Sequence, residues 1–201
     1  MTLSRLGMVD PDPGGVAESL ASLDEAIALI EPALRANPKS STMAIQLSMT
    51  REYAGHRLLA LGQIAAAERQ YRQGLAEVEA PIATARLSNV VQAFTHEEAL
   101  AALFTSKGDR ASALDFANRA VIRATALYNI DPKSEPRIAH LGRAYAELAA
   151  VDRAFKEAAA SRAASQRALE IWSTIKDRPA MFLHRQSYES TLAFLSAQFS
   201  Q

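Results

Sequence analysis

The sequence contains no cysteine. Disulfide bonds, thiolate catalysis and cysteine-ligated metal sites are therefore excluded, and the chain fits a reducing compartment. There is no net charge either, because 22 lysines and arginines balance 22 aspartates and glutamates. This balance argues against nucleic acid and against an anionic membrane as partners. No apolar run is long enough for a signal peptide or a membrane span, so we predict a cytoplasmic location.

Patterns typical of β-strands are also missing. Valine, isoleucine and threonine are sparse, and no convincing run alternates apolar with polar residues. Alanine, in contrast, makes up about a fifth of the 201 residues, and it favours helix more than any other residue. With 49% apolar residues the chain can bury a substantial core. We therefore predict an all-α protein.

The expected helices follow from the spacing of apolar residues. A loose segment is expected over residues 1–15, which end in D-P-D-P-G-G. Beyond it, apolar residues recur at spacings of three and four, the period of a helix. Pro32 lies inside the first run and should bend that helix or fray its last turn. The helices are predicted over residues 16–36, 40–61, 64–79, 82–106, 109–130, 134–150, a stretch that follows a turn located somewhere between 150 and 157 and ends near 177, and 180–198.

The stretch from Arg51 to Gly74 represents the unit that recurs. Two helical runs meet there at Gly62, and they form a hairpin whose faces are too small to make a core alone. Copies on both sides must complete these faces. Small residues stand where the two helices would have to approach closely: Ala54, Gly55, Ala67 and Gly74. Prolines that end helices recur about every forty to fifty residues, a period typical of stacked helix pairs: Pro38, Pro81, Pro132 and Pro179.

The residues of these hairpins resemble the tetratricopeptide repeat (TPR) family. That pattern has a large residue, Leu-Gly and Tyr in its first helix, then Ala, an aromatic, a small residue and a terminal proline. The first half is matched well by Ile138, Leu141, Gly142 and Tyr145. Further matches are Ala26, Ile30, Ala33, Leu34, Asn37 and Pro38, then Ala54, Gly55, Leu58, Gly62, Ala67 and Tyr71, and more weakly Leu100, Phe104, Gly108, Ala113 and Ala120.

The resemblance covers nearly all of residues 16–178. It implies a right-handed α-solenoid of about three to four TPR-like hairpins, made of about seven helices. Residues 179–201 would then form a C-terminal capping helix. The repeats run longer than the usual 34 residues, and the third has about seven extra residues between its helices, so we expect elongated hairpins.

The ending A-L-x-x-N-P at residues 33–38 also resembles the C-terminal TPR arrays of some bacterial serine/threonine protein kinases. The first unit lacks its leading helix, as expected of a chain that begins inside a repeat of a longer protein. This resemblance implies the regulatory part of a larger signalling protein.

No catalytic motif is present. The sequence has no glycine-rich kinase loop, H-R-D loop, P-loop, nucleophile elbow or H-E-x-x-H helix. The triplet D-F-A at residues 115–117 is not a metal-binding D-F-G, and Phe116 is expected to pack in a core. We predict that the chain is not an enzyme and carries no metal or cofactor.

Four histidines recur at intervals near the repeat length, and converging histidines are typical metal ligands or general bases. Successive repeats are displaced along a solenoid, however, so we expect these side chains not to converge. The four are His56, His96, His140 and His184.

In the TPR family the first helix of each pair lines a concave groove that binds a peptide or a partner helix. By the repeat register the groove side should include Met49, Glu52, Tyr53, His56, Glu98, Ala102, Thr105, His140, Arg143 and Glu147. These residues are mixed in charge and partly acidic, which disfavours a clamp for a partner's C-terminal carboxylate. Tyr53 can stack on a ligand, although an aromatic residue at helical spacing belongs to a core more often.

We therefore predict a non-catalytic interaction scaffold whose partner is an unknown protein or peptide, or another domain of the same polypeptide. The alternative is a small-molecule-sensing helical regulatory domain, with the ligand held between long helices near residues 151–161. The last helix is predicted to cap the array, and a homodimer through it is the alternative. Its apolar residues are Phe182, Leu183, Leu192, Phe194, Leu195 and Phe199.

Overall fold

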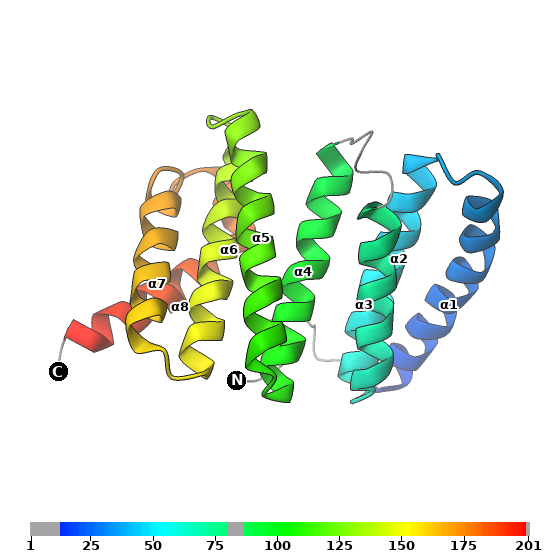
Figure 1. Ribbon diagram of the computed structural model, residues 1–201, viewed down its shortest axis with the longest axis horizontal. Coiled ribbons are helices and arrows are strands. Elements are labelled where there is room, and N and C mark those ends of the chain that lie inside the picture. The colour runs from blue at the N-terminus through cyan, green and yellow to red at the C-terminus, as the bar shows by residue number, and fades with distance from the viewer. Residues whose placement is uncertain (1–12, 80–86, 200–201) are drawn as a thin grey trace. The chain divides into compact units, whose positions relative to one another are not determined.

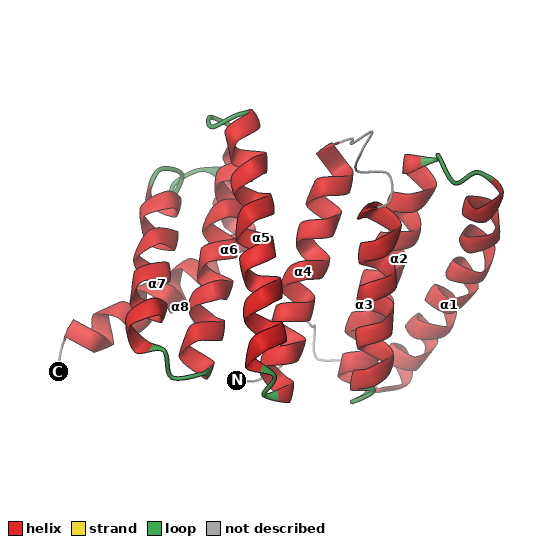
Figure 2. Cartoon of the chain, in the orientation of Figure 1, coloured by secondary structure: helices red, strands yellow, loops and turns green. Residues whose placement is uncertain are grey.

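The computed structural model describes residues 13–79 and 87–199. Every regular element in these ranges is a helix (Figure 1), and Figure 2 shows only loops between them. The all-α, repeat-like fold predicted from the alanine content is therefore confirmed. The elements are α1 (Pro13–Ala36), α2 (Ser41–Ala60), α3 (Ile64–Glu79), α4 (Leu87–Lys107), α5 (Arg110–Ile130), α6 (Glu135–Ala154), α7 (Ala158–Ser173), the 3-10 helix η3 (Pro179–His184) and α8 (Arg185–Phe199).

Helices α2, α4 and α6 end in the same kind of turn, and each turn leads into the second helix of a hairpin. The hairpin is therefore the repeated unit. After α2, the amides of Gly62 and Gln63 donate back to carbonyls of the last helical turn, at 3.0 and 2.8 Å. Gly62 has a positive φ of 71°, which glycine adopts without a steric cost. The same pair of hydrogen bonds closes α4 at Gly108 and α6 at Lys156, with φ values of 73° and 63°.

Lys156 locates the one boundary that the sequence left open. The turn between α6 and α7 lies at residues 155–157, inside the range of 150–157 in which this turn was expected. Two helices also begin at a side-chain cap. The side chain of Ser40 accepts from the amide of Met43 at 3.3 Å, and that of Asp109 from the amide of Ser112 at 3.1 Å.

Helix α1 differs from its prediction at its start. It begins at Pro13, so residues 13–15 are helical rather than part of a loose segment. A proline in the first turn costs no hydrogen bond, because the amides there have no partner inside the helix. Pro32 also stays within α1, which continues to Ala36. The predicted start at Ile82 and the proline at 81 lie outside the described residues.

The chain divides into two compact units, residues 1–103 and 104–201, where the sequence predicted one array over residues 16–178. In the first unit α2 packs against both α1 and α3. In the second unit α6 packs against α5 and α7, and η3 and α8 lie against α6 and α7. The predicted single helix over residues 180–198 is thus a 3-10 turn followed by α8.

Close helix approach at small residues is confirmed in the α2–α3 hairpin. Ala54, Gly55, Ala67 and Gly74 are all buried, and any Cβ added at Gly55 would overlap the ring of Tyr71. The extra residues predicted between α6 and α7 are not found, because α6 and α7 have 20 and 16 residues, the same as α2 and α3.

The close contact between a glycine and an aromatic ring lies at a different position in the α6–α7 hairpin than in the α2–α3 hairpin. Gly142 lies in the first half of α6 and packs on the indole of Trp172 near the end of α7. The indole Nε1 of Trp172 donates to the carbonyl of Ala139 at 3.1 Å. The glycine contact of the α6–α7 hairpin therefore lies farther from its turn than the Gly55–Tyr71 contact lies from the turn at Gly62.

Candidate functional site

A buried polar network joins α2, α3 and α4 in the first unit. The hydroxyl of Ser48 donates to the carbonyl of Gly74 at 2.8 Å, so it must accept from Nε2–H of His96, which also lies at 2.8 Å. His96 is fully buried. Burial lowers its pKa to about 4, and it is therefore neutral near pH 7. The histidine here is a structural donor.

A second part of the network surrounds Glu52. Its carboxylate accepts from Nε2 of Gln92 at 2.5 Å, and its other oxygen lies 3.6 Å from Nε2 of His56. The hydroxyl of Tyr71 donates to Nδ1 of His56 at 2.9 Å. Burial raises the pKa of Glu52, but the hydrogen bonds from His56 and Gln92 outweigh it, and the net pKa is lowered. Glu52 is thus held as an anion that links α2 to α4.

The order Tyr71, His56, Glu52 resembles a proton relay of a general base, but its geometry does not suit catalysis. Tyr71 is fully buried, and burial together with the nearby Glu52 raises the pKa of its hydroxyl. A substrate must come within about 3 Å of a catalytic group. Tyr71 offers no such approach, so the relay holds helices together.

One pair of the four histidines is in contact, contrary to the prediction that repeats would keep them apart. His56 and His96 each meet the ring of Tyr71, with centroids 5.6 and 6.2 Å from it. His140 meets His184 edge to face at 6.4 Å. Side chains on neighbouring helices reach one another, which the repeat spacing alone did not reveal. In the described ranges no group of three or more potential ligands could hold a metal ion.

The predicted groove residues of the first unit are exposed to different degrees. Tyr53 is 52% exposed and Met49 is 38% exposed, one helical turn apart. Glu52 is turned toward Gln92 of α4 and His56 toward Tyr71 of α3, and their side chains are only 16% and 19% exposed. On α4, half-buried residues recur at positions 91, 95, 98 and 102. We use the name α2–α4 surface for the predicted groove residues Met49, Glu52, Tyr53, His56 and Glu98.

The predicted groove residues of the second unit are partly covered by the chain itself. His140 of α6 lies against His184 of η3. Burial, together with the smaller effect of the charge of Arg143, lowers the pKa of both rings to about 4. Glu147 on α6 and Thr105 on α4 are half-buried. The C-terminal segment therefore occupies part of the surface where a partner was expected.

The C-terminal segment packs on α6 and α7. Met181 and Leu195 are buried, and the guanidinium of Arg153 lies 4.5 Å from the centroid of the Phe194 ring. Leu192 stays exposed. The side chains of the remaining predicted apolar residues, Phe182, Leu183 and Phe199, lie outside the described part of the chain. Phe116 is a packing residue as predicted, since its ring stacks on that of Phe104 at 5.7 Å.

Arg51 is a site that sequence reasoning missed. It is buried, and its Nε lies 2.6 Å from the carboxylate of Glu77 on α3. Its Nη2 lies 3.5 Å from Glu31 on α1. Gln70 and Gln73 accept from its Nη1 at 3.0 and 3.1 Å. Only the position of Arg51 on the buried side of α2 could have indicated this role.

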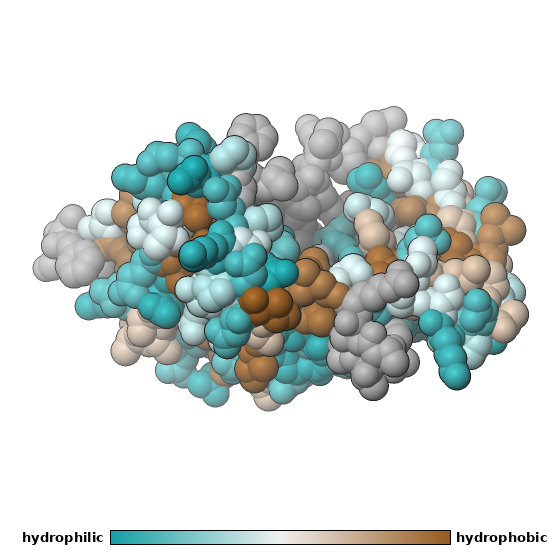
Figure 3. Space-filling model, turned by 90° about the horizontal axis from the view of Figure 1, so that it is seen from above, coloured by the Kyte–Doolittle hydropathy of each residue, from teal (hydrophilic) through white to brown (hydrophobic). Residues whose placement is uncertain are grey.

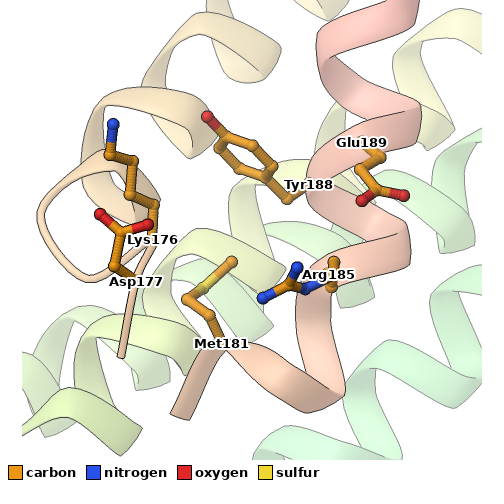
Figure 4. Close-up of a pocket in the computed structure, with 6 residues that line it drawn as sticks. All are labelled: Lys176, Asp177, Met181, Arg185, Tyr188 and Glu189. Atoms are coloured by element: carbon orange, nitrogen blue, oxygen red, sulfur yellow. The ribbon is translucent and has the colours of Figure 1, made fainter. Parts of the chain in front are cut away.

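A small pocket of about 190 Å³ lies beside the cap (Figure 4). Ligand sites usually measure about 300–1,000 Å³, so this one is small for a metabolite. Near the α6–α7 turn, where the alternative prediction places a ligand, the hydroxyl of Ser161 donates to the carbonyl of Ala149 at 2.8 Å. The pocket is lined by Lys176 and Asp177 after α7, Met181 of η3, and Arg185, Tyr188 and Glu189 of α8.

On the face displayed in Figure 3, hydrophobic residues lie among hydrophilic ones. Single exposed apolar residues are normal on protein surfaces and need no partner. None of the described helices is both long and apolar enough to cross a membrane.

Comparison with known proteins gives a fold but no family. No family model matches the sequence, and no curated protein matches it. Among solved structures, BtubC (BKLC) from P. vanneervenii is similar, with a TM-score of 0.57 and 18% sequence identity. The match covers 87% of this chain and 70% of that chain. At this identity the similarity concerns the fold alone.

Proposed function

We propose that this chain is a non-catalytic interaction scaffold of the TPR kind that binds a peptide or a partner domain. The observation that carries the proposal is the exposed pair Met49 and Tyr53, which lies beside the bonded residues Glu52 and His56 on α2. Methionine and tyrosine are enriched in protein interfaces and depleted from ordinary surfaces. The repeated hairpin turn and the contact of Gly55 with Tyr71 support the TPR assignment.

The network beneath the surface suits a binding role. Gln92 and His96 of α4 bond to Glu52 and Ser48 of α2, so the backbone beneath Met49 and Tyr53 is fixed before a partner arrives. A preorganised surface loses less conformational entropy on binding, and this raises its affinity. A catalytic role is disfavoured, because the groups that could act as acid or base bond to one another.

The proposal places the chain in the cytoplasm, as the regulatory part of a larger bacterial signalling protein. Its partner is a protein, a peptide or another domain of the same polypeptide. The zero net charge of the whole chain gives nucleic acid or a membrane little attraction.

The test is selection from a random peptide library displayed on phage, with the immobilised chain as bait. The affinity of a selected peptide is then measured by fluorescence polarisation for the parent chain and for Tyr53→Ala. We expect Tyr53→Ala to weaken binding about tenfold or more, as loss of an interface tyrosine does.

Ile122→Ala is the matched control, since Ile122 is exposed on α5 in the other unit. Binding by Ile122→Ala should equal that of the parent, and circular dichroism should show both variants folded. A selected peptide that binds Tyr53→Ala as tightly as the parent would contradict the assignment of the surface.

A further inference from the structure

The C-terminal segment of residues 179–199, made of η3 and α8, lies on the second unit along one regular stripe. In the described part of this segment, the buried residues and the half-buried Tyr188 follow one another at spacings of three, four, three and four. Such spacing places side chains on one side of a helix, as in the seam of a coiled coil. We call these five residues the cap seam: Met181, His184, Tyr188, Thr191 and Leu195.

The segment contacts α6 and α7, and one of these contacts covers a predicted groove residue. The ring of His184 meets the ring of the groove residue His140 on α6, with centroids 6.4 Å apart. Tyr188 meets Trp172 of α7 edge to face at 6.2 Å. Because the chain's own segment is bound there, this surface of α6 and α7 accepts a helix whose contacting side chains recur at the 3-4-3-4 spacing.

Several features weaken this attachment. Three of the five seam residues are polar, and polar residues at seam positions cost stability. The segment begins with six residues of 3-10 helix, although such helices seldom exceed about four residues because their hydrogen bonds have poor geometry. Met181 and Tyr188 also border the pocket of about 190 Å³, where Figure 4 shows Tyr188 extending toward the loop of Lys176 and Asp177. The seam is therefore not closely packed at this point.

Helix α7 is held on α6 more firmly. The hydroxyl of Ser161 donates to the carbonyl of Ala149, and the indole of Trp172 donates to the carbonyl of Ala139. Both hydrogen bonds are buried. Opening of the C-terminal segment alone should therefore cost less free energy than unfolding of α7.

We infer that the surface of α6 and α7 beneath the cap seam binds an amphipathic helix of a partner, and that residues 179–199 occupy this site in its absence. The helix that fits carries apolar side chains at the 3-4-3-4 spacing, including the positions that His184 and Thr191 take in this chain. It buries more apolar surface than the chain's own segment and so displaces that segment. The inference goes beyond the proposed function, because this site is independent of Tyr53.

The lack of cysteine makes opening of the segment measurable, since a single introduced thiol has no competitor. The full chain is prepared with Leu195→Cys in the cap seam or with Ala168→Cys in α7, two positions that are both buried. The rate at which an aromatic disulfide reagent modifies each thiol in native buffer reports its exposure. We expect the thiol of Leu195→Cys to react at least about tenfold faster, because the segment opens while α7 stays folded. Equal rates would show that both positions become exposed only on unfolding, and would overturn the inference.

His184→Leu tests whether the polar seam residues weaken the attachment. Leucine places apolar surface at this buried position, so His184→Leu combined with Leu195→Cys should slow the modification about threefold or more. A rate that stays the same or rises would mean that the imidazole strengthens the seam, and would contradict the inference.

The probe for the site is a synthetic peptide of residues 179–199 that carries His184→Leu and Thr191→Leu. We expect it to bind the full chain in fluorescence polarisation. At saturation it should accelerate modification of the Leu195→Cys thiol about tenfold or more, because the displaced segment is exposed. The control peptide carries Met181→Asp and Leu195→Asp in addition, which put charges into the seam, and it should not bind. A probe that does not bind, or that binds without accelerating the modification, would overturn the inference.

Binding of the probe to Tyr53→Ala separates this site from the proposed function. We expect the probe to bind Tyr53→Ala and the parent chain with equal affinity. Loss of binding in Tyr53→Ala would place the peptide on the α2–α4 surface, which would overturn the inference and support the proposed function. Dimers of the parent chain that the probe dissociates in light scattering would assign the site to the same segment of a second copy, and would also overturn the inference.

Discussion

At the scale of single residues, Gly55 is the position where the α2–α3 hairpin tolerates least change. A Cβ there would overlap the ring of Tyr71, and that ring is fixed by its hydrogen bond to His56. We predict that Gly55→Leu lowers the free energy of unfolding by about 1–3 kcal/mol, the usual cost of overpacking. Urea denaturation measures the change.

Gly15 provides the control for this prediction. It lies in the first turn of α1, and a Cβ added there meets nothing within 4 Å. Gly15→Ala should be neutral or should stabilise the chain by up to about 1 kcal/mol, because alanine has the higher helix propensity. A Gly55→Leu variant as stable as the parent would contradict the close approach of α2 and α3.

His96 should make stability depend on pH. Its pKa is lowered by burial from 6.5 to about 4. Between these values the unfolded chain binds more protons than the folded chain, so the free energy of unfolding falls as the pH is lowered through this window. We predict a lower urea midpoint at about pH 5 than at about pH 7. His140 and His184 act with the same sign, since their pKa values are also lowered to about 4.

His96→Gln separates this histidine from the others. A glutamine amide can still donate to the hydroxyl of Ser48 but does not titrate. The variant should therefore lose part of the difference between the two midpoints. An unchanged pH dependence in His96→Gln would show that His96 titrates normally and is not buried as described.

At the scale of helices, the sequence predicted caps and turns where a specialised residue occurs. Ser40 and Asp109 were recognisable as caps and Gly62 as a turn, because each supplies the chemistry that a helix end requires. The third hairpin turn has Lys156 at its positive-φ position, and lysine carries no such signal. The boundary between α6 and α7 could therefore not be placed from the sequence.

The unusual turn residue leads to a prediction for the α6–α7 hairpin. Lys156 has a φ of 63°, a conformation that costs a residue with a Cβ roughly 1 kcal/mol or more. Lys156→Gly should therefore stabilise the chain by about 0.5–1 kcal/mol, although glycine gives up part of the gain through its freedom in the unfolded chain. Thermal unfolding measures the shift, and Gly62→Ala in the equivalent turn should lower the melting temperature.

The buried charge of Arg51 joins three helices of the first unit, α1, α2 and α3. Its removal leaves the carboxylate of Glu77 without its cation in a site where burial raises the pKa of that group. We predict that Arg51→Met destabilises the chain by about 3–5 kcal/mol, the usual cost of removing one partner of a buried ion pair. The double variant Arg51→Met, Glu77→Leu should recover part of this loss in urea denaturation.

At the scale of the whole molecule, the sequence predicted which side of each helix is exposed better than it predicted the contacts made there. Tyr53 is exposed on the expected side of α2, but Glu52 and His56 are mostly buried, Glu52 against Gln92 of α4 and His56 against Tyr71 of α3. The periodicity of apolar residues identifies the buried face of one helix, whereas the burial of a polar side chain depends on a hydrogen-bond partner from a neighbouring helix. Gln92 and Tyr71 are these partners, and the repeat pattern does not indicate either of them.

Because neighbouring hairpins bury one another's apolar faces, a substitution that destabilises one hairpin should also destabilise its neighbours. Gly55 and Tyr71 join α2 to α3, and α2 in turn packs on α1 and bonds to α4 through Glu52 and Ser48. Stability in such arrays is a sum of repeat and neighbour terms. In Gly55→Leu, amide hydrogen exchange should accelerate in α2 and α3 and, to a smaller extent, in α1 and the first part of α4. Exchange in the α7–α8 pair should stay at the parent's rate, and acceleration confined to α2 and α3 would mean that the hairpin is stable without its neighbours.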